Sequence, residues 1–142
     1  MKRKIKKYLA NKVGLWVKNN PKLMDKNKKR FLFMRWLAEV LANEYESTLV
    51  IYKIASYLNT NNATYSFTDI FTAGDHVFIV TRHAGMWNGK GGCIIEEIAN
   101  LINTNAKGEK THNYELTTID DHASSVSQMR EAVRVYNVSP EV

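Results

Sequence analysis

The feature of this chain best suited to chemistry is the glycine-rich segment Gly89-Lys90-Gly91-Gly92. It lies between an apolar stretch that ends near Arg82 and an amphipathic stretch that begins at Cys93. Glycine lets a backbone approach a ligand closely, and the unpaired N–H groups and dipole at a helix start favour phosphate. Lys90 adds a positive charge, but no Ser or Thr follows it as in a Walker loop. The segment therefore predicts an anion site of another kind.

Two residues near this segment are candidates for moving a proton. His83 follows the apolar stretch, and an ordinary histidine pKa of ~6.5 suits a general base near neutrality. Asp75, before that stretch, is the second candidate. The competing interpretation for His83 is a hydrogen-bonded surface residue.

Cys93 suggests a different chemistry. A thiol at a helix start has a lowered pKa and could act as a nucleophile, with His112 as its base and Asp120 orienting the histidine. The competing interpretation is a small buried cysteine without a role. No pair among the four histidines and the single cysteine has zinc-finger or HExxH spacing, so we expect no metal site.

The glycine-rich segment resembles motif A of the Gcn5-related N-acetyltransferase (GNAT) superfamily, Arg/Gln-x-x-Gly-x-Gly/Ala. Asn88 takes the Arg/Gln position, Gly91 matches, and Cys93 replaces the last small residue. An apolar helix follows motif A, as Ile94-Ile95-Glu96-Glu97-Ile98 does here.

A second motif of the superfamily, Asn-x-x-Ala-x-x-x-Tyr-x-Lys-x-Gly-Phe, is similar to the stretch after residue 120. Asp121 takes the Asn position, Ser124 the Ala, Gln128 the Tyr, Arg130 the Lys, and Ala132-Val133 the Gly-Phe. The resemblance covers residues 46–138.

The resemblance implies an α+β fold in which helices flank a mixed, mostly antiparallel sheet, here with two additional N-terminal helices. It implies one domain over residues 1–142, with a basic helical part, 1–45, and a part that carries the sheet and the acyl-CoA site, 46–138. Acetyl-CoA or another acyl-CoA would be the cosubstrate. Its pyrophosphate would contact Asn88, Gly89, Lys90, Gly91, Gly92 and Cys93, and its pantetheine arm would contact the backbone of Ile79, Val80 and Thr81.

An unidentified amine, on a small molecule or a protein, would then attack the thioester directly. The tyrosine that often protonates the leaving thiolate in this superfamily is Gln128, which cannot act as an acid. One alternative is therefore a GNAT-like protein without catalysis that works by contact. The chain also resembles small phage proteins of this type, which are virion components or could bind a host factor.

The elements that would position these residues follow from apolar spacing. Helical spacing over residues 1–18 places Ile5, Tyr8, Leu9, Val13 and Trp16 on one expected core face, and Pro21 ends this helix. A second helix is expected over 25–45, with a core face of Phe33, Trp36, Leu37, Val40 and Leu41. Residues 48–52 favour a strand, although a helix through Leu58 fits as well.

The second half of the chain alternates between strands and helices. We expect strands over 65–71 and 76–82 joined by a turn at 72–75, a loop to Asn88, a helix over 93–102 and a strand over 112–119. A polar helix over 121–132 and a last strand over 133–138 would complete the order.

Positive charge is concentrated near the N-terminus of the chain. Residues 1–35 hold ten Lys and three Arg against Asp25 alone, whereas the whole chain has a net charge of +6. This predicts an anionic partner for residues 1–35, an acidic protein, a nucleic acid or a membrane surface, unless the lysines only keep the protein soluble. A basic nucleic-acid-binding protein is thus a further alternative. The single cysteine and the lack of a long apolar segment predict a cytoplasmic protein, or a virion-associated one if it comes from a phage.

Overall fold

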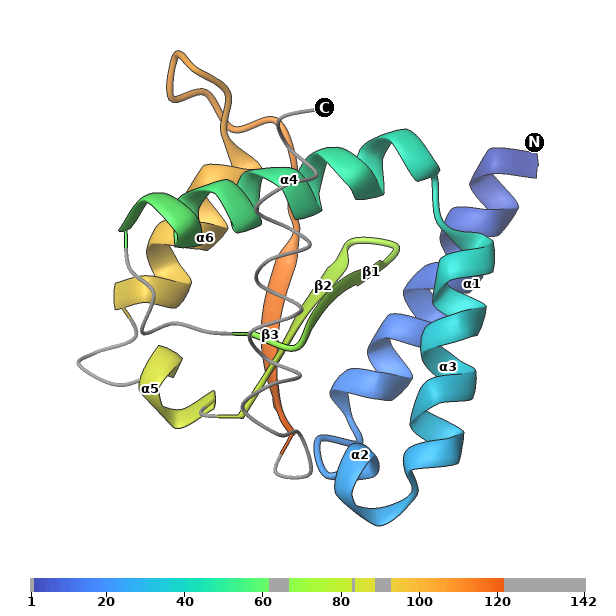
Figure 1. The fold of residues 1–142 in the computed structure, drawn as a ribbon. Coiled ribbons are helices and arrows are strands. Elements are labelled where there is room, and N and C mark those ends of the chain that lie inside the picture. Colours follow the sequence, from blue (N-terminus) through green and yellow to red (C-terminus); the bar gives the residue numbers. More distant parts are fainter. Residues whose placement is uncertain (1, 62–66, 83, 89–92, 122–142) are drawn as a thin grey trace.

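The computed structural model describes residues 2–61, 67–82, 84–88 and 93–121. Helices surround a small central sheet (Figure 1). In chain order the elements are α1 (Lys2–Lys18), α2 (Leu23–Lys26), α3 (Lys28–Leu41), α4 (Glu44–Asn61), β1 (Asp69–Ala73), β2 (His76–Thr81), α5 (Ala84–Asn88), α6 (Cys93–Asn103) and β3 (Glu115–Asp120).

The sheet has the order β1-β2-β3 and is mixed, as expected. Of its two strand pairs in the described part of the chain, one is antiparallel and one is parallel, so the expected antiparallel majority is absent there. β1 and β2 form an antiparallel hairpin in which Ala73 pairs with His76, across a two-residue turn. Gly74 in this turn has a φ of +64°, a conformation that glycine adopts without strain. β3 pairs with β2 in parallel, from His76↔Glu115 to Thr81↔Asp120. β2 is therefore the central strand, bonded on both sides.

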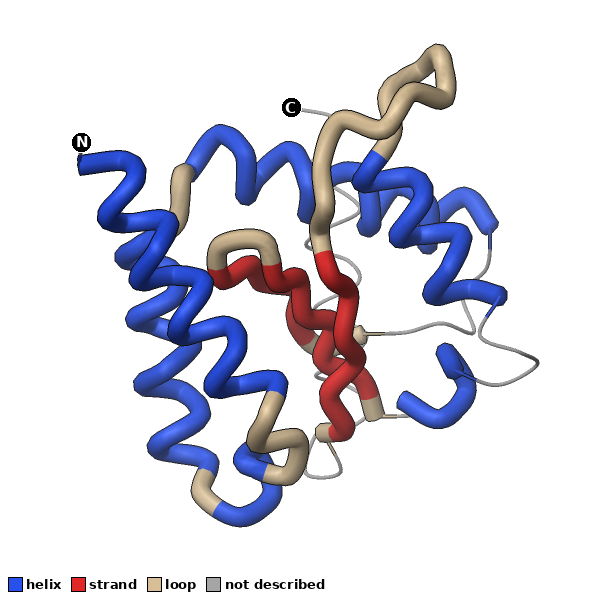
Figure 2. Tube along the Cα trace, turned by 180° about the vertical axis from the view of Figure 1, so that it is seen from behind, coloured by secondary structure: helices blue, strands red, loops and turns tan. Residues whose placement is uncertain are grey.

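The two faces of the sheet support separate cores, which gives three layers (Figures 1 and 2). Alternate residues of β2 point to opposite sides, as strand geometry requires. Val77 and Ile79 pack with α4 and α6, whereas Phe78 and Val80 belong to the cluster that includes residues of α1 and α3. All four side chains are fully buried. The coarse prediction, an α+β fold with helices around a mixed sheet, is confirmed; the GNAT fold itself stays a prediction.

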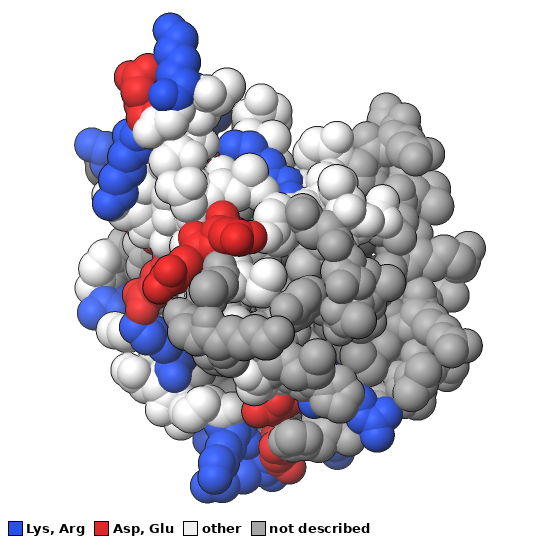
Figure 3. Space-filling view, turned by 90° about the vertical axis from the view of Figure 1, so that its left-hand side faces the viewer, with Lys and Arg blue, Asp and Glu red and all other residues white. Residues whose placement is uncertain are grey.

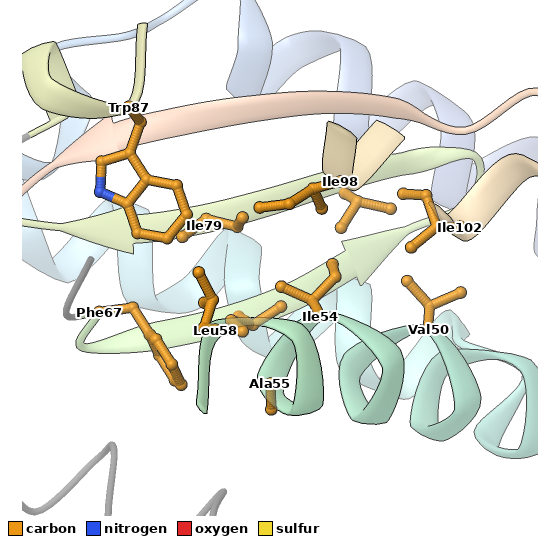
Figure 4. Close-up of a cluster of buried hydrophobic side chains, with 11 residues drawn as sticks. Val50, Ile54, Ala55, Leu58, Phe67, Ile79, Trp87, Ile98 and Ile102 are labelled. Atoms are coloured by element: carbon orange, nitrogen blue, oxygen red, sulfur yellow. The ribbon is translucent and has the colours of Figure 1, made fainter. Parts of the chain in front are cut away.

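The core on the first face is built largely by α4 and α6 (Figure 4). Val50, Ile54 and Leu58 of α4 lie one turn apart and are buried with Ile98 and Ile102 of α6. Burying each such side chain contributes about 1.5–3 kcal/mol. The strand predicted over 48–52 is therefore wrong and the helical alternative through Leu58 is correct. Its four-residue spacing of apolar residues outweighs the β propensity of its residue types.

α1 ends at Lys18 before Pro21, as predicted, but the predicted core face is correct only in part, at Val13 and the partly buried Trp16. Ala10, Val13, Gly14 and Val17 pack on the sheet and hairpin, whereas Ile5, Tyr8 and Leu9 are exposed. A Cβ atom on Gly14 would lie 2.6 Å from a ring carbon of His76. The small residues of α1 thus allow close contact, which a search for large apolar residues does not predict.

The helix predicted over 25–45 is divided and shorter. α2 ends before Asn27, whose side-chain oxygen accepts the Arg30 N–H at 3.1 Å and so caps α3. α3 buries Phe31 and Ala38. The predicted core face was wrong in part, because Phe33, Trp36 and Val40 are about half exposed.

β2 and α6 closely match their predicted ranges, whereas β3 begins three residues later than expected, at Glu115. The predicted helix over 121–132 and strand over 133–138 lie outside the described residues apart from Asp121, which is buried. Within the described part of the chain, no helix has the length and apolar character needed to cross a membrane.

Candidate functional site

The connection from β2 to β3 carries the glycine-rich segment, and the structure fixes both of its ends. α5 begins where the Ala84 N–H donates to Asp120 Oδ1 at 3.0 Å. Trp87 of α5 is 1% exposed, and its indole N–H donates to Thr81 Oγ1 at 3.2 Å. These two bonds attach α5 to the ends of β2 and β3.

α6, which follows the glycine-rich segment in the chain, is fixed by packing in the core. Ile98 and Ile102 are fully buried against α4 and the sheet, while Ile94 and Ile95 in the first turn are only partly buried. Residues 89–92 are outside the described residues, but the bounds of α5 and α6 show that they connect two helices. The residues that flank the segment, Asn88 and Cys93, belong to helices that pack on the core.

The presence of α5 corrects one expectation. A strand ending at residue 82 and a loop to Asn88 were predicted between the hairpin and the glycines. Instead, a short helix lies between Thr81 and the glycines. Of the described side chains of α5, Ala84 and Trp87 are buried, and two residues are too few to predict a helix from sequence.

The three residues expected to hold a pantetheine arm lie inside the sheet. Ile79, Val80 and Thr81 are at most 1% exposed. The Val80 carbonyl accepts the Thr68 N–H at 2.7 Å, and the Thr81 carbonyl accepts the Asp121 N–H at 2.9 Å. Since these carbonyl groups already have partners, an extended ligand would have to displace them. Their role as acyl-CoA contacts stays a prediction.

The structure does not bring Asp75 to the start of α6. Asp75 precedes β2, and its six residues to Thr81 span about 20 Å of extended chain. Its carboxylate pairs with Lys7 Nζ at 3.2 Å, and its N–H donates to Asn11 Oδ1 at 2.7 Å. Asp75 thus attaches the hairpin turn to α1. His83, the other predicted base, lies outside the described residues, as do the side chains of Asn88 and Cys93.

The rival Cys93–His112–Asp120 arrangement is not assembled by the described residues. Asp120 accepts the Ala84 N–H, and the exposed His112 stacks on Tyr114 with ring centroids 5.0 Å apart. Asp120 ends β3, whereas His112 precedes its start. Among the described residues, no group of three or more His, Cys, Asp and Glu side chains could hold a metal ion.

A second cluster, which the sequence did not predict, surrounds His76 at the start of β2. Its side chain is 13% exposed, and its Nδ1 lies 3.7 Å from Glu115 Oε2, too far for a hydrogen bond. Glu115 instead accepts a bond from Lys18 of α1. Burial, assisted by the Lys18 charge, lowers the His76 pKa below 6.5 despite the opposing effect of Asp75. These groups meet only through the tertiary fold.

The lowered His76 pKa predicts an acid-sensitive fold. Below about pH 6.5 the unfolded chain binds a proton that the folded protein resists, so stability falls as the pH drops from 6.5 toward the lower folded pKa. A His76→Asn variant should lose this part of the pH dependence in urea unfolding measured between pH 5 and pH 7.5, about the range where histidine titrates. His112→Gln, at an exposed histidine, is the matched control and should retain it. Equal slopes in all three proteins would contradict the prediction.

An open pocket of about 620 Å³ lies at this same edge of the sheet. Basic residues of α1 form one side, and the α3–α4 connection forms the other with acidic residues. The lining includes Arg3, Lys6, Lys7, Glu39, Glu44 and Glu46. Tyr114 also lines it, and burial together with the charges of Glu46 and Asp75 raises the Tyr114 pKa above 10. Because the lining contains both basic and acidic side chains, its charge does not select an anionic or a cationic ligand.

The surface on the side of α5 and α6 carries both signs of charge. Figure 3 shows described acidic side chains in a short band left of centre and in smaller groups at the top and bottom, where basic side chains lie beside them. Glu96 and Glu97 of α6 are exposed, and Glu97 accepts a bond from the Tyr57 hydroxyl. Glu97 is thereby directed toward α4.

Comparisons with known proteins give no relative. No protein-family model, curated protein or solved structure matches this chain.

Proposed function

We propose that the α5–glycine–α6 region binds the sugar-phosphate backbone of single-stranded nucleic acid, RNA in particular. The observation that carries this proposal is that Gly89-Lys90-Gly91-Gly92, a Gly-x-x-Gly sequence, connects two helices. KH modules bind single-stranded RNA through a Gly-x-x-Gly loop that clamps four backbone nucleotides. The region is similar to that element.

The physical basis is close approach and charge. Glycine has no Cβ atom, so phosphates can reach the backbone N–H groups of such a segment. Lys90 supplies a cation there, whereas the excess of positive charge in the chain lies in residues 1–35.

Acyl-CoA binding, with transfer to an amine, is the second candidate. It is favoured by the parallel pairing of β2, which precedes α6 in the chain, with β3, which follows it. The pyrophosphate of CoA would use the same glycines. It is disfavoured by the bonded carbonyls of Val80 and Thr81 and by α5, which separates β2 from the glycines. We therefore place it second.

Titration of a labelled single-stranded RNA, followed by fluorescence anisotropy, tests the proposal. We expect saturable binding that weakens with salt, because phosphate contacts release counterions, and little binding of an RNA duplex of equal length. Excess acetyl-CoA should not displace the RNA. Calorimetric binding of acetyl-CoA at micromolar concentration, about 8 kcal/mol, with no RNA binding would favour the second candidate instead.

A further inference from the structure

The outward side of α1 and α3 exposes large apolar residues. Eight of them, each 44–60% exposed, define what we call the α1/α3 outer face: Ile5, Tyr8, Leu9 and Leu15 of α1, and Leu32, Phe33, Trp36 and Val40 of α3. Isolated exposed apolar residues are ordinary, but a large exposed apolar patch marks an interaction surface. Two of its members, Phe33 and Trp36, have ring centroids 5.9 Å apart.

The spacing places these side chains away from the sheet. α1 buries Ala10, Val13, Gly14 and Val17, and at 100° per residue Tyr8 and Leu15 lie on the opposite side. On α3 the same reasoning places Phe33, Trp36 and Val40 opposite Phe31 and Ala38. α1 and α3 lie side by side in both views (Figures 1 and 2). Their outward sides therefore form one surface.

Positive charge accompanies this apolar surface. Lys4 and Lys12 of α1 and Lys29 of α3 fall on the same outward sides by helical spacing, and all three are exposed. Lys12 Nζ lies 5.4 Å from the centre of the Tyr8 ring, a cation–π contact. Asp25 is the only acidic residue among positions 1–35. The surface thus combines apolar side chains with an excess of cations.

We infer that the α1/α3 outer face docks on an anionic phospholipid bilayer. Amphipathic helices with Trp, Phe and Leu beside Lys bind the membrane interface by burying apolar area and attracting anionic headgroups. Nucleic acid would match the charge, and the aromatic residues of the face can stack on bases. The other five, Ile5, Leu9, Leu15, Leu32 and Val40, are aliphatic and offer bases no stacking partner, whereas a bilayer accepts all eight. An anionic bilayer satisfies both properties of this face. The inference is independent of the nucleic-acid site, which lies on another part of the chain.

Vesicle sedimentation with the full chain tests this inference. We compare vesicles of phosphatidylcholine alone with vesicles that contain about 30% phosphatidylserine, and we expect at least about tenfold stronger binding to the anionic ones. Phe33→Ser/Trp36→Ser should weaken that binding at least about tenfold. Leu49→Ser/Tyr52→Ser, at residues 41% and 42% exposed on α4, is the matched control and should bind as the unaltered protein does.

The contribution of the basic residues is tested by charge-reversal variants in the same vesicle assay. Lys4→Glu/Lys12→Glu should reduce anionic-vesicle binding at least about tenfold, because each basic residue near the surface contributes to attraction. Lys107→Glu/Lys110→Glu makes the same charge change at exposed positions outside the face and should have a small effect. Thermal melting of every variant confirms that it is folded.

Four results would overturn the inference. The first is no binding to either vesicle. The second is binding that the face variants and their controls weaken equally. The third is concentration-dependent dimerisation of the unaltered protein that Phe33→Ser/Trp36→Ser abolishes, which would assign the face to a second copy of the chain. Saturating single-stranded RNA should leave vesicle binding intact. The fourth contradicting result is competition between RNA and vesicles, which would make this face part of a nucleic-acid surface.

Discussion

A Gly91→Glu variant is expected to lose single-stranded RNA binding by at least about thirtyfold, on the basis that it places a carboxylate among phosphate contacts. The thermal midpoint should change little, since residues 89–92 connect two helices that the core already holds. Anisotropy titration at fixed salt measures the loss.

The matched control for this variant is Ala106→Glu, which adds the same carboxylate at an exposed position between α6 and β3. It should bind RNA with an affinity close to that of the unaltered protein. If Gly91→Glu and Ala106→Glu bind equally well, the glycine segment does not contact phosphate, and the nucleic-acid proposal fails at this position.

Trp87→Ala should be among the most destabilising substitutions in the described part of the chain. The indole is 1% exposed in the core that joins α5 to α4 and α6 (Figure 4), and its removal leaves a cavity that costs about 3–5 kcal/mol. The Thr81 hydroxyl also loses this donor. Because α5 ends immediately before the glycine segment, RNA affinity should fall as well.

Urea unfolding measures this effect against two reference variants. Trp36→Ala, at a residue 54% exposed on α3, should cost less than about 0.5 kcal/mol. Trp87→Phe retains most of the volume but loses the hydrogen bond to Thr81, and it should fall between the two alanine variants. A Trp87→Ala protein as stable as Trp36→Ala would show that α5 is not packed as described.

The hairpin and α6 could be predicted from sequence because local signals determine them. A Gly-Asp turn separates two apolar, β-branched runs, and the isoleucines of α6 recur at helical spacing. α4 was ambiguous because Leu49-Val50-Ile51-Tyr52 has strand-forming residue types within a helical pattern. Only packing against α6 and the sheet selects the helix.

The buried sides of α1 and α3 were predicted less well for a different physical reason. Apolar spacing assumes that the largest residues face the core. Here Ala10, Gly14 and Ala38 are buried because helix and sheet approach closely, whereas Trp36 and Tyr8 are left outside. Residue type alone cannot distinguish an apolar core face from an apolar interaction surface.

The glycine segment could be located from sequence, but its role as a binding site stays a prediction because residues 89–92 lie outside the described residues. The glycine segment stands out by composition, and its connection to α6 was expected. The helix α5 before it was not expected, and it is the reason that we propose a Gly-x-x-Gly nucleic-acid site before an acyl-CoA site. The His76 cluster depends on Lys18 and Glu115, which are 97 residues apart, and no local pattern reports such a contact.

The measurement that tests the central claim most directly is a nuclear magnetic resonance titration of the ¹⁵N-labelled protein with single-stranded RNA. Seven glycines provide reporters along the chain. The proposal predicts that the amide signals of Gly89, Gly91 and Gly92 shift on binding, while those of Gly14 and Gly108 stay in place. Shifts confined to α1 and α3, or none in the glycine segment at saturating RNA, would contradict it.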